Sequence, residues 1–254
     1  LRMNTERIFA INSFIQMRGE VHLKDLMELY PNVSAMTLRR DIDYLEKQGH
    51  IVRTRGGAKS IRRLTQLSEE AYSLRNVENA DKKSEIAQKA LRFFGDAVSY
   101  YIDAGTTMMQ LAKQLPDSRC FIVTNAPNIA IELSRIPEAG IIVLGGNLRR
   151  EHLSISGTGA LEQIKSINID VAFIATSGYS RQNGFTNGSF YECELKRSVL
   201  AKAKQRVMLM DSGKYDRILP YTFATMEDID YLVSDSGLPE SVTEDAKKHN
   251  TVII

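Results

Sequence analysis

The sequence has little of the residue types on which metal-binding, disulfide-bonded and membrane proteins depend. Its 254 residues include two cysteines, four histidines and no tryptophan. Cys120 and Cys193 have no CxxC spacing, so the sequence indicates neither a zinc site nor a disulfide framework. No apolar run approaches the roughly eighteen residues that cross a bilayer, and the N-terminal segment lacks the apolar core of a signal peptide. We therefore expect a cytoplasmic protein that binds no metal or cofactor and does not associate with a membrane.

The composition is otherwise that of an ordinary globular protein, but the charge is unevenly distributed. Charged residues make up 25% of the chain and hydrophobic residues 43%, and the length exceeds that of one typical domain. Residues 1–63 hold 12 Lys and Arg against 7 Asp and Glu, whereas residues 64–254 hold 21 against 24. The net charge of +2 thus conceals a basic N-terminal part, which indicates a nucleic-acid-binding module joined to a near-neutral domain with another role.

One segment near the N-terminus, Val33 to Gly49, predicts a helix with an apolar and a basic face. Ser34 suits the N-cap. Branched apolar side chains then recur at helical spacing, at Leu38, Ile42 and Leu45. The opposite face and its flanks carry Met36, Thr37, Arg39, Arg40, Asp43, Tyr44 and Lys47. The alternative interpretation is a solvated surface helix whose arginines pair with Asp41 and Asp43.

The residues around this helix extend it to a winged helix-turn-helix. Helical spacing predicts two earlier helices, at 6–17 and 23–30, and Pro31-Asn32 predicts the turn before the third. After the third helix, apolar and basic residues alternate up to a turn at Gly56-Gly57, which predicts a basic hairpin. In such a module the third helix enters the major groove of DNA, and the hairpin touches the backbone or the minor groove.

The rest of the chain predicts a second domain of alternating strands and helices. A polar, weakly periodic segment at 59–75 predicts a linker between a DNA-binding domain at 1–58 and an α/β domain at 76–254. Short apolar runs predict strands at 97–103, 120–124, 140–144, 170–176, 206–210, 231–233 and 251–254. Segments with helical spacing predict helices at 82–94, 107–115, 126–133, near Leu161, 192–203 and 239–249. This alternation indicates a mostly parallel sheet covered by helices on both faces.

Three turns in this second domain follow predicted strands and carry groups that suit an anionic ligand. In open α/β sheets, ligands bind at the carboxyl ends of strands. The turn at 103–107 joins a glycine and two hydroxyls to a helix start, which offers amides and donors to a phosphate. The second turn contains Asn125, and the third, at 145–147, has two glycines that let a ligand approach the backbone. Any one of them could be a plain structural turn, but three at successive strand ends predict a ligand pocket.

Both halves of the chain carry motifs of one protein family. The segment VSAMTLRRDIDYLEKQGHIVRTRGGA at 33–58 resembles the N-terminal signature of the DeoR family of bacterial transcriptional regulators, V-S-x-x-T-[IL]-R-R-D-[IL]-x-x-L followed by a basic wing with G-G-A. In the second half, DAGTT, VTNAPNIA, LGG, GFTNGSFYECELKR and DSGK resemble the sensor motifs of that family. The chain departs from the family pattern in a longer turn before Val33 and in His22, Ala104 and Gly213, which stand where hydroxyl residues are often found.

The resemblance implies a second domain with a fold like that of ribose-5-phosphate isomerase and an effector that is a phosphorylated sugar or related metabolite. By motif, the implied effector-binding residues are Asp103, Gly105, Thr106, Thr107, Asn125, Gly145, Glu192 and Lys214. On the DNA-binding face we expect Arg40 to contact a base edge, since a guanidinium matches the two acceptors of guanine. The residues expected at phosphates are Ser34, Thr37, Arg39, Lys47, Arg53 and Arg55, and Met36 and Tyr44 complete this face. Asp41 lies nearer the buried stripe, where we expect it to hold Arg39 or the wing.

The sequence therefore predicts a DNA-binding transcriptional regulator, a repressor of a sugar-use operon, rather than an enzyme. Its expected partners are double-stranded operator DNA, a phosphorylated sugar and further copies of itself in a homodimer or homotetramer, because one short recognition helix reads few base pairs. Two alternatives remain open. Asp103, Glu192 and Lys214 could assemble the base of a sugar-phosphate isomerase, although a DNA-binding module would not help such an enzyme. The chain could also bind DNA constitutively, with an α/β domain that only oligomerises.

Overall fold

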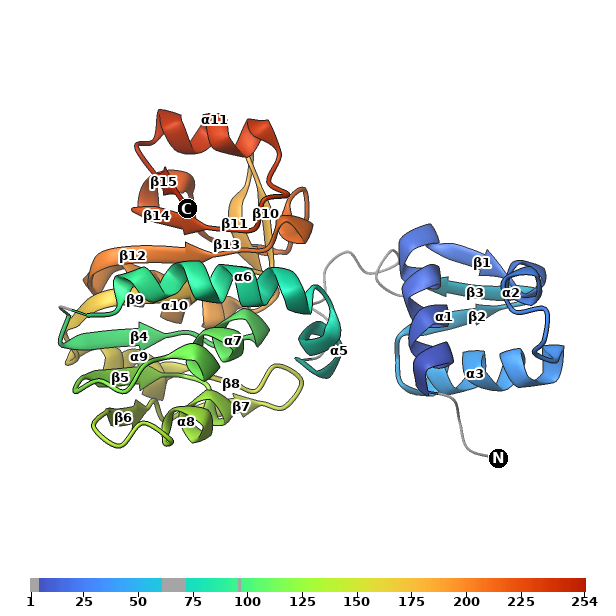
Figure 1. Cartoon of the computed structure of the whole chain (residues 1–254), viewed down its shortest axis with the longest axis horizontal. Helices are drawn as coiled ribbons and strands as arrows, with labels where there is room; N and C mark the ends of the chain where they lie inside the picture. The colour runs from blue at the N-terminus through green and yellow to red at the C-terminus, as the bar shows by residue number, and fades with distance from the viewer. Residues whose placement is uncertain (1–4, 61–71, 96) are drawn as a thin grey trace. The chain divides into compact units, whose positions relative to one another are not determined.

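The computed structural model describes residues 5–60, 72–95 and 97–254, and the chain forms two compact units, Leu1–Ser68 and Glu69–Ile254 (Figure 1). Of the linker expected at 59–75, residues 61–71 lie outside the described residues. Lys59 and Ser60 belong to the last strand of the first unit. Residues 72–75 belong to helix α5 (Tyr72–Val77), the first described element of the second unit.

The first unit is a winged helix-turn-helix, as the sequence predicts. Its elements are α1 (Thr5–Arg18), β1 (Glu20–His22), α2 (Leu23–Leu29), α3 (Ala35–Lys47), β2 (Ile51–Thr54) and β3 (Gly57–Ser60). The strands form an antiparallel sheet in the order β1-β3-β2, so the hairpin β2-β3 is the wing. The wing turn lies at Arg55-Gly56, one residue earlier than predicted, because Gly57 already pairs with His22. A Cβ atom on Gly57 would lie 2.0 Å from the carbonyl oxygen of Val21, so this close strand approach requires glycine.

A small apolar core holds the three helices of the first unit together. It contains side chains from α1, α2 and α3 that are almost fully buried: Ile11, Ile15, Leu26, Leu38, Ile42 and Leu45. Burial of one such side chain contributes about 1.5–3 kcal/mol to folding. Because the predicted apolar stripe of α3 is part of this core, the opposite face of α3 is left to solvent.

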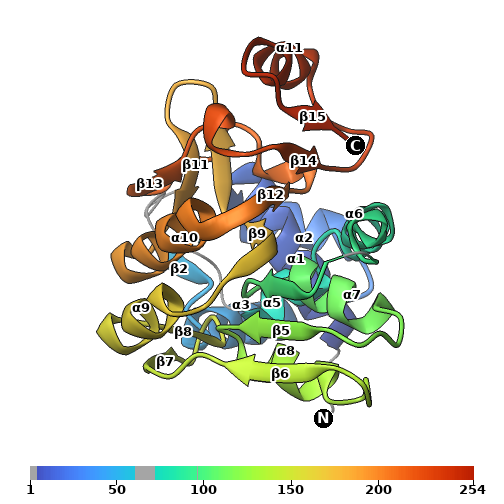
Figure 2. The ribbon, with the colours of Figure 1, turned by 90° about the vertical axis from the view of Figure 1, so that its left-hand side faces the viewer.

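The second unit is built on a seven-stranded parallel sheet with helices on both faces, which confirms the predicted α/β class (Figure 2). The strand order is β15-β14-β12-β9-β4-β5-β6, and every neighbouring pair is parallel. The strands are β4 (Ser99–Ile102), β5 (Phe121–Thr124), β6 (Gly140–Val143), β9 (Ile169–Ala175), β12 (Ala203–Leu209), β14 (Tyr231–Val233) and β15 (Val252–Ile253).

The helices of the second unit divide between two buried clusters, one on each side of this sheet. The first cluster takes side chains from α6 (Ala80–Ala90), α7 (Thr106–Gln114) and α8 (Pro127–Leu133). The second takes them from α9 (Thr158–Lys165), α10 (Phe190–Lys202) and α11 (Glu240–Lys248). Figure 2 shows α6 and α7 on one side of the strands and α9 and α10 on the other. Strands buried on both faces read as continuous apolar runs, which is why the sequence pattern predicts them.

Two small antiparallel sheets lie outside the parallel sheet, and the sequence pattern predicts neither. One pairs β7 (Asn147–Arg149) with β8 (Ser154–Ser156). The other contains β10 (Gly178–Ser180), β11 (Gly184–Asn187) and β13 (Tyr221–Ala224). Unlike the parallel strands, these strands have no continuous apolar run, and with three or four residues they are too short for an alternation of polar and apolar residues to be recognised. They nevertheless matter for the site, because β10 follows the carboxyl end of β9 and β11 leads back into α10.

The structure also describes the state of both cysteines and the lengths of the helices. Cys120, just before β5, and Cys193, in α10, are both buried and free. Among the helices of the described ranges, none is both long enough and apolar enough to span a bilayer.

Candidate functional site

The recognition surface of the first unit is formed by α3 and the wing. Ser34 caps α3, since its Oγ accepts a hydrogen bond from the Thr37 amide at 3.2 Å and lies 2.9 Å from Thr37 Oγ1. The predicted DNA-binding residues of the helix are exposed at Met36, Arg39, Arg40 and Lys47, and half-buried at Thr37 and Tyr44. In winged helices this exposed face is the one that enters the major groove.

Asp41 holds α3 to α1, and not to Arg39 or the wing, which corrects the expectation from sequence. Its carboxylate accepts from Arg7 Nε at 2.8 Å and from Arg7 Nη2 at 3.3 Å, and the residue is only 3% exposed. The hydrogen bond to Asp41 raises the pKa of Arg7, against the opposing effect of burial. Arg39 and Arg40 have no ion-pair partner within the described residues. Their charges are therefore available to DNA, which disfavours the alternative of arginines paired along the helix surface.

The wing is tied to α3 by two acidic residues. Asp43 forms an ion pair with Arg53 Nη1, and Glu46 Oε1 accepts a hydrogen bond from the Arg53 amide at 3.1 Å. Arg53, which the sequence analysis assigns to a phosphate, thus has its guanidinium occupied in the free protein. Arg55, in the wing turn, is exposed and has no ion-pair partner in the part of the chain that the structure describes. A cleft between α3 and the wing is lined by Leu23, Arg39, Ile42, Arg53, Thr54, Arg55, Gly56 and Gly57.

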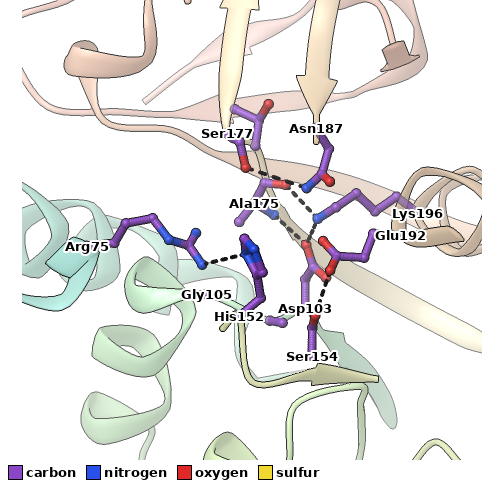
Figure 3. Close-up of a pocket in the computed structure, with 12 residues that line it drawn as sticks. Arg75, Asp103, Gly105, His152, Ser154, Ala175, Ser177, Asn187, Glu192 and Lys196 are labelled. Atoms are coloured by element: carbon purple, nitrogen blue, oxygen red, sulfur yellow. Dashed lines mark hydrogen bonds and ion pairs between the residues drawn. The ribbon is translucent and has the colours of Figure 1, made fainter. Parts of the chain in front are cut away.

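The second unit has a polar pocket at the carboxyl ends of β4 and β9 (Figure 3). In chain order the sheet runs outward from β4 through β5 to β6, and then from β9 through β12 and β14 to β15 on the other side. The crevice at such a reversal of strand order is where open α/β sheets bind ligands. The pocket is lined by Arg75, Asp103, Ala104, Gly105, His152, Ser154, Ala175, Thr176, Ser177, Asn187, Glu192 and Lys196.

This pocket has little free space. Its free volume is about 20 Å³, which leaves room for about one water molecule. The pocket is open to solvent, so a larger ligand can bind at its mouth, but its inner part is filled by the lining side chains.

A buried ion pair joins α10 to the ends of β4 and β9. Lys196 Nζ donates to Asp103 Oδ2 and to the carbonyl oxygen of Ala175 at 2.8 Å, and the Ala175 amide donates to Asp103 Oδ2 at 3.1 Å. Asp103 is 1% exposed and Lys196 is 4% exposed. Removal of one partner from a buried pair costs about 3–5 kcal/mol, so this pair fixes the geometry of the pocket.

Glu192 is the second buried acid of the pocket, and its charge is also compensated. Its Oε1 accepts from Ser154 Oγ at 2.7 Å, and Arg149 Nη1 lies 3.5 Å away. Glu192 occupies the first turn of α10, where the helix dipole favours a negative charge. Burial raises the pKa of the neighbouring Tyr101 well above its usual value, and the charges of Asp103 and Glu192 raise it further. The buried Tyr101 hydroxyl has no hydrogen-bond partner among the described residues, so it remains a neutral donor.

Three of the predicted effector residues line the pocket, namely Asp103, Gly105 and Glu192. Thr106 and Thr107 are buried at the start of α7, directly after Gly105, and do not line it. The start of α7 therefore lies at the pocket, although its two hydroxyl side chains do not.

The other three predicted effector residues lie elsewhere. Asn125 Nδ2 donates to the carbonyl oxygen of Ile155 at 3.1 Å, and the Gly145 amide donates to Gln163 Oε1 at 3.0 Å, so both residues hold loops in place. Lys214 lies in the short helix η2 (Ser212–Lys214), 3.9 Å from Asp211 Oδ2, and burial lowers its pKa. None of the three lines the pocket.

Lys196 is the lysine that pairs with Asp103 in the pocket, whereas Lys214 is the lysine predicted from the sequence to bind the effector. One signal could have identified it, because Lys196 follows Glu192 by four residues and therefore shares its face of the helix. Arg75 lies in the segment interpreted as a linker, and Asn187 belongs to a strand that the pattern does not predict. Neither could be assigned to the pocket from sequence.

The chain is similar to known transcriptional regulators along most of its length. Sequence profiles of the DeoR-like helix-turn-helix domain and the DeoR C terminal sensor domain match residues 7–63 and 78–236. The HTH-type transcriptional repressor GlcR of Bacillus subtilis (strain 168) is 32% identical, over 97% of this chain and 94% of that protein. The HTH-type transcriptional regulator IolR of the same organism is 30% identical, over 97% of each chain. Among solved structures, the sorbitol operon regulator SorC from Klebsiella pneumoniae has 10% identity and a TM-score of 0.40, over 84% of this chain and 91% of that one.

Proposed function

We propose that this chain, which belongs to the DeoR family of helix-turn-helix transcriptional regulators, represses a sugar-metabolism operon. In this proposal, a phosphorylated sugar or related metabolite modulates its affinity for operator DNA. One observation carries this proposal. A single chain combines a winged helix whose recognition-helix arginines, Arg39 and Arg40, have no carboxylate partner among the described residues with a polar pocket at the switch point of a parallel sheet. A regulator needs both parts, one to bind the operator and one to receive a signal.

The first unit supplies the DNA contacts in this proposal. Arg40 reads a base edge in the major groove, and Arg39, Lys47 and Arg55 neutralise phosphates. Ser34, Thr37, Met36 and Tyr44 complete the contact surface, and Arg53 joins it only when it leaves its ion pair with Asp43. Repression is supported by the relative GlcR, which is named as a transcriptional repressor.

The second unit supplies the effector site. Its lining offers hydroxyl, amide and carboxylate groups, which suit the hydroxyls of a sugar. Gly105 and the amides that begin α7 suit a phosphate, because the N-terminus of a helix attracts anions. We further propose that the chain acts as a homodimer or homotetramer, since one recognition helix reads too few base pairs for adequate specificity.

An isomerase with an appended DNA-binding unit is less well supported. A catalytic base must be free to take a proton from the substrate. Asp103 already accepts from Lys196 and from the Ala175 amide, and Glu192 accepts from Ser154. The relatives are named as regulators.

The test begins with an operator selected by the full-length protein from a random duplex library. Thermal unfolding is then measured with a panel of sugar phosphates, since a ligand at 100 times its dissociation constant should add about 2.7 kcal/mol of stability. Each ligand that binds should change operator affinity by about 5- to 150-fold. If no member of the panel changes operator affinity, the domain senses something else or only oligomerises. Turnover of any member would favour the isomerase.

A further inference from the structure

Helix α5 is attached to the rest of the second unit by polar contacts at both ends. At its start, the Tyr72 amide donates to the carbonyl oxygen of Glu151 at 2.7 Å. At its end, the ammonium group of Lys83 donates to the carbonyl oxygens of Arg75 and Glu78. A helix of six residues is not stable by itself, so the position of α5 depends on these contacts.

Between these ends, the side chain of Arg75 extends from α5 into the pocket (Figure 3). Its Nη2 lies 3.4 Å from Nδ1 of His152, which is close to the upper limit for a hydrogen bond. Its Nε is buried and has no hydrogen-bond partner among the described residues. A buried guanidinium N–H without an acceptor is unfavourable, so a ligand that brings an acceptor to this end of the pocket would stabilise it.

The other charges of the pocket compensate one another. Lys196 pairs with Asp103, and Glu192 has Arg149 at 3.5 Å. Of the cations that line the pocket in the described part of the chain, Arg75 alone has no carboxylate partner. The positive charge of Arg75 is therefore not compensated by a carboxylate, and an anionic ligand could compensate it. A phosphate suits this position, because a guanidinium binds a phosphate with two parallel hydrogen bonds.

We propose that Arg75 binds the phosphate of the effector and that this contact couples the pocket to the DNA-binding unit. The inference rests on the proposed function, and it names the residue that transmits effector binding from the pocket to the DNA-binding unit. An effector that reaches the inner end of the pocket displaces part of the lining, because the free volume there is about 20 Å³. The Arg75–His152 contact is weak, and a phosphate replaces it with charge-assisted bonds. Because α5 is the first described element after the DNA-binding unit in the sequence, a shift of α5 changes the part of the second unit that is nearest that unit along the chain.

The experiment compares full-length wild type with Arg75→Gln, Arg75→Lys and a control, Arg92→Gln. Arg92 is an exposed arginine of the helix η1 (Leu91–Phe93) and does not line the pocket. Calorimetry measures the binding of the sugar phosphates that bind wild type and of inorganic phosphate. Titration measures affinity for the selected operator without ligand and at saturation. Circular dichroism and thermal unfolding report whether each variant is folded. If Arg75→Gln does not fold, the comparison uses Arg75→Lys, which retains the charge and most of the volume of arginine.

We expect Arg75→Gln to bind the sugar phosphate at least tenfold more weakly than wild type. At saturation, both Arg75 variants should retain operator affinity within twofold of their ligand-free value, whereas wild type and Arg92→Gln release the operator. A purely structural role for Arg75 would weaken binding but leave the release at saturation unchanged, and that result overturns the inference. If wild type itself binds no sugar phosphate, the proposed function fails, and the inference fails with it.

Discussion

At the scale of single residues, the arginines of the recognition surface differ in whether they form an ion pair. Arg53 pairs with Asp43, whereas Arg40 and Arg55 have no ion-pair partner among the described residues. Arg40 lies in the middle of the exposed face of α3 and has no ion-pair partner in the described ranges. Arg40→Ala should weaken operator binding by about 1–3 kcal/mol and relax the preference at one base pair per half-site. Titration on operator and on random duplex DNA checks this. An equal loss on both would mean that Arg40 contacts a phosphate.

Arg55, at the exposed turn of the wing, should behave differently from Arg40. A phosphate contact releases counterions, so its loss appears in the salt dependence of binding. Arg55→Ala should reduce the slope of log affinity against log salt by about 0.9 on any duplex. Binding is measured at several salt concentrations on operator and random DNA. An unchanged slope would remove the wing from the DNA backbone.

At the scale of elements, the pairing between α3 and the wing determines how the surface is charged. Asp43 occupies the guanidinium of Arg53 and adds a negative charge beside the recognition helix. Asp43→Asn should free Arg53 to reach a phosphate, which steepens the salt slope by about 0.9 and tightens binding to random DNA. Asp117→Asn, an exposed change in the second unit, controls for the net charge. If Asp43→Asn and the control variant have the same salt slope, Arg53 already contacts the DNA backbone in the wild-type complex.

The sequence predicts the long and regular elements well, for a physical reason. The stripe of Leu38, Ile42 and Leu45 and the apolar runs of the parallel strands repeat with the period of their own structure. The three-stranded sheet around β11 has no such period, because its short strands mix glycine, polar and apolar residues, and β13 pairs with β11 from far along the chain.

The pocket is predicted only in part, and the reason is similar. The strand-end turn with Asp103 is a local pattern, so it could be recognised. The contact between Lys196 and Asp103 joins residues 93 positions apart, and that between Arg75 and His152 joins residues 77 apart. No local spacing predicts such contacts, and the family motifs alone led to Lys214.

At the scale of the whole molecule, self-association should be a property of the second unit. Among the described residues, eleven of the sixteen exposed large apolar side chains belong to the second unit, whose surface is therefore better supplied for an interface. Sedimentation of the full chain and of Glu69–Ile254 should therefore give the same number of subunits. A fragment that is monomeric at tens of micromolar while the full chain is not would assign the interface to the first unit.

The stability of the whole chain should also depend on pH above neutrality, because of Lys83. Burial, with the nearby Lys214, lowers the pKa of Lys83 from 10.5 to about 8. Between these two values the unfolded chain binds a proton that the folded chain does not, so the free energy of unfolding rises with pH. The rise attributable to Lys83 should be about 3 kcal/mol at most. Denaturation of wild type and Lys83→Met from pH 7 to 10.5 measures it, and parallel curves for the two proteins would contradict it.

The wing is held against α3 by contacts made within the first unit, before any DNA arrives. A surface that already has its binding shape loses little conformational entropy when it docks. Its association with DNA can therefore approach the rate of an encounter steered by its basic charge, and differences between DNA sequences appear in the rate of dissociation. If the proposed effector acts as we infer, it should therefore change the rate of dissociation from the operator more than the rate of association.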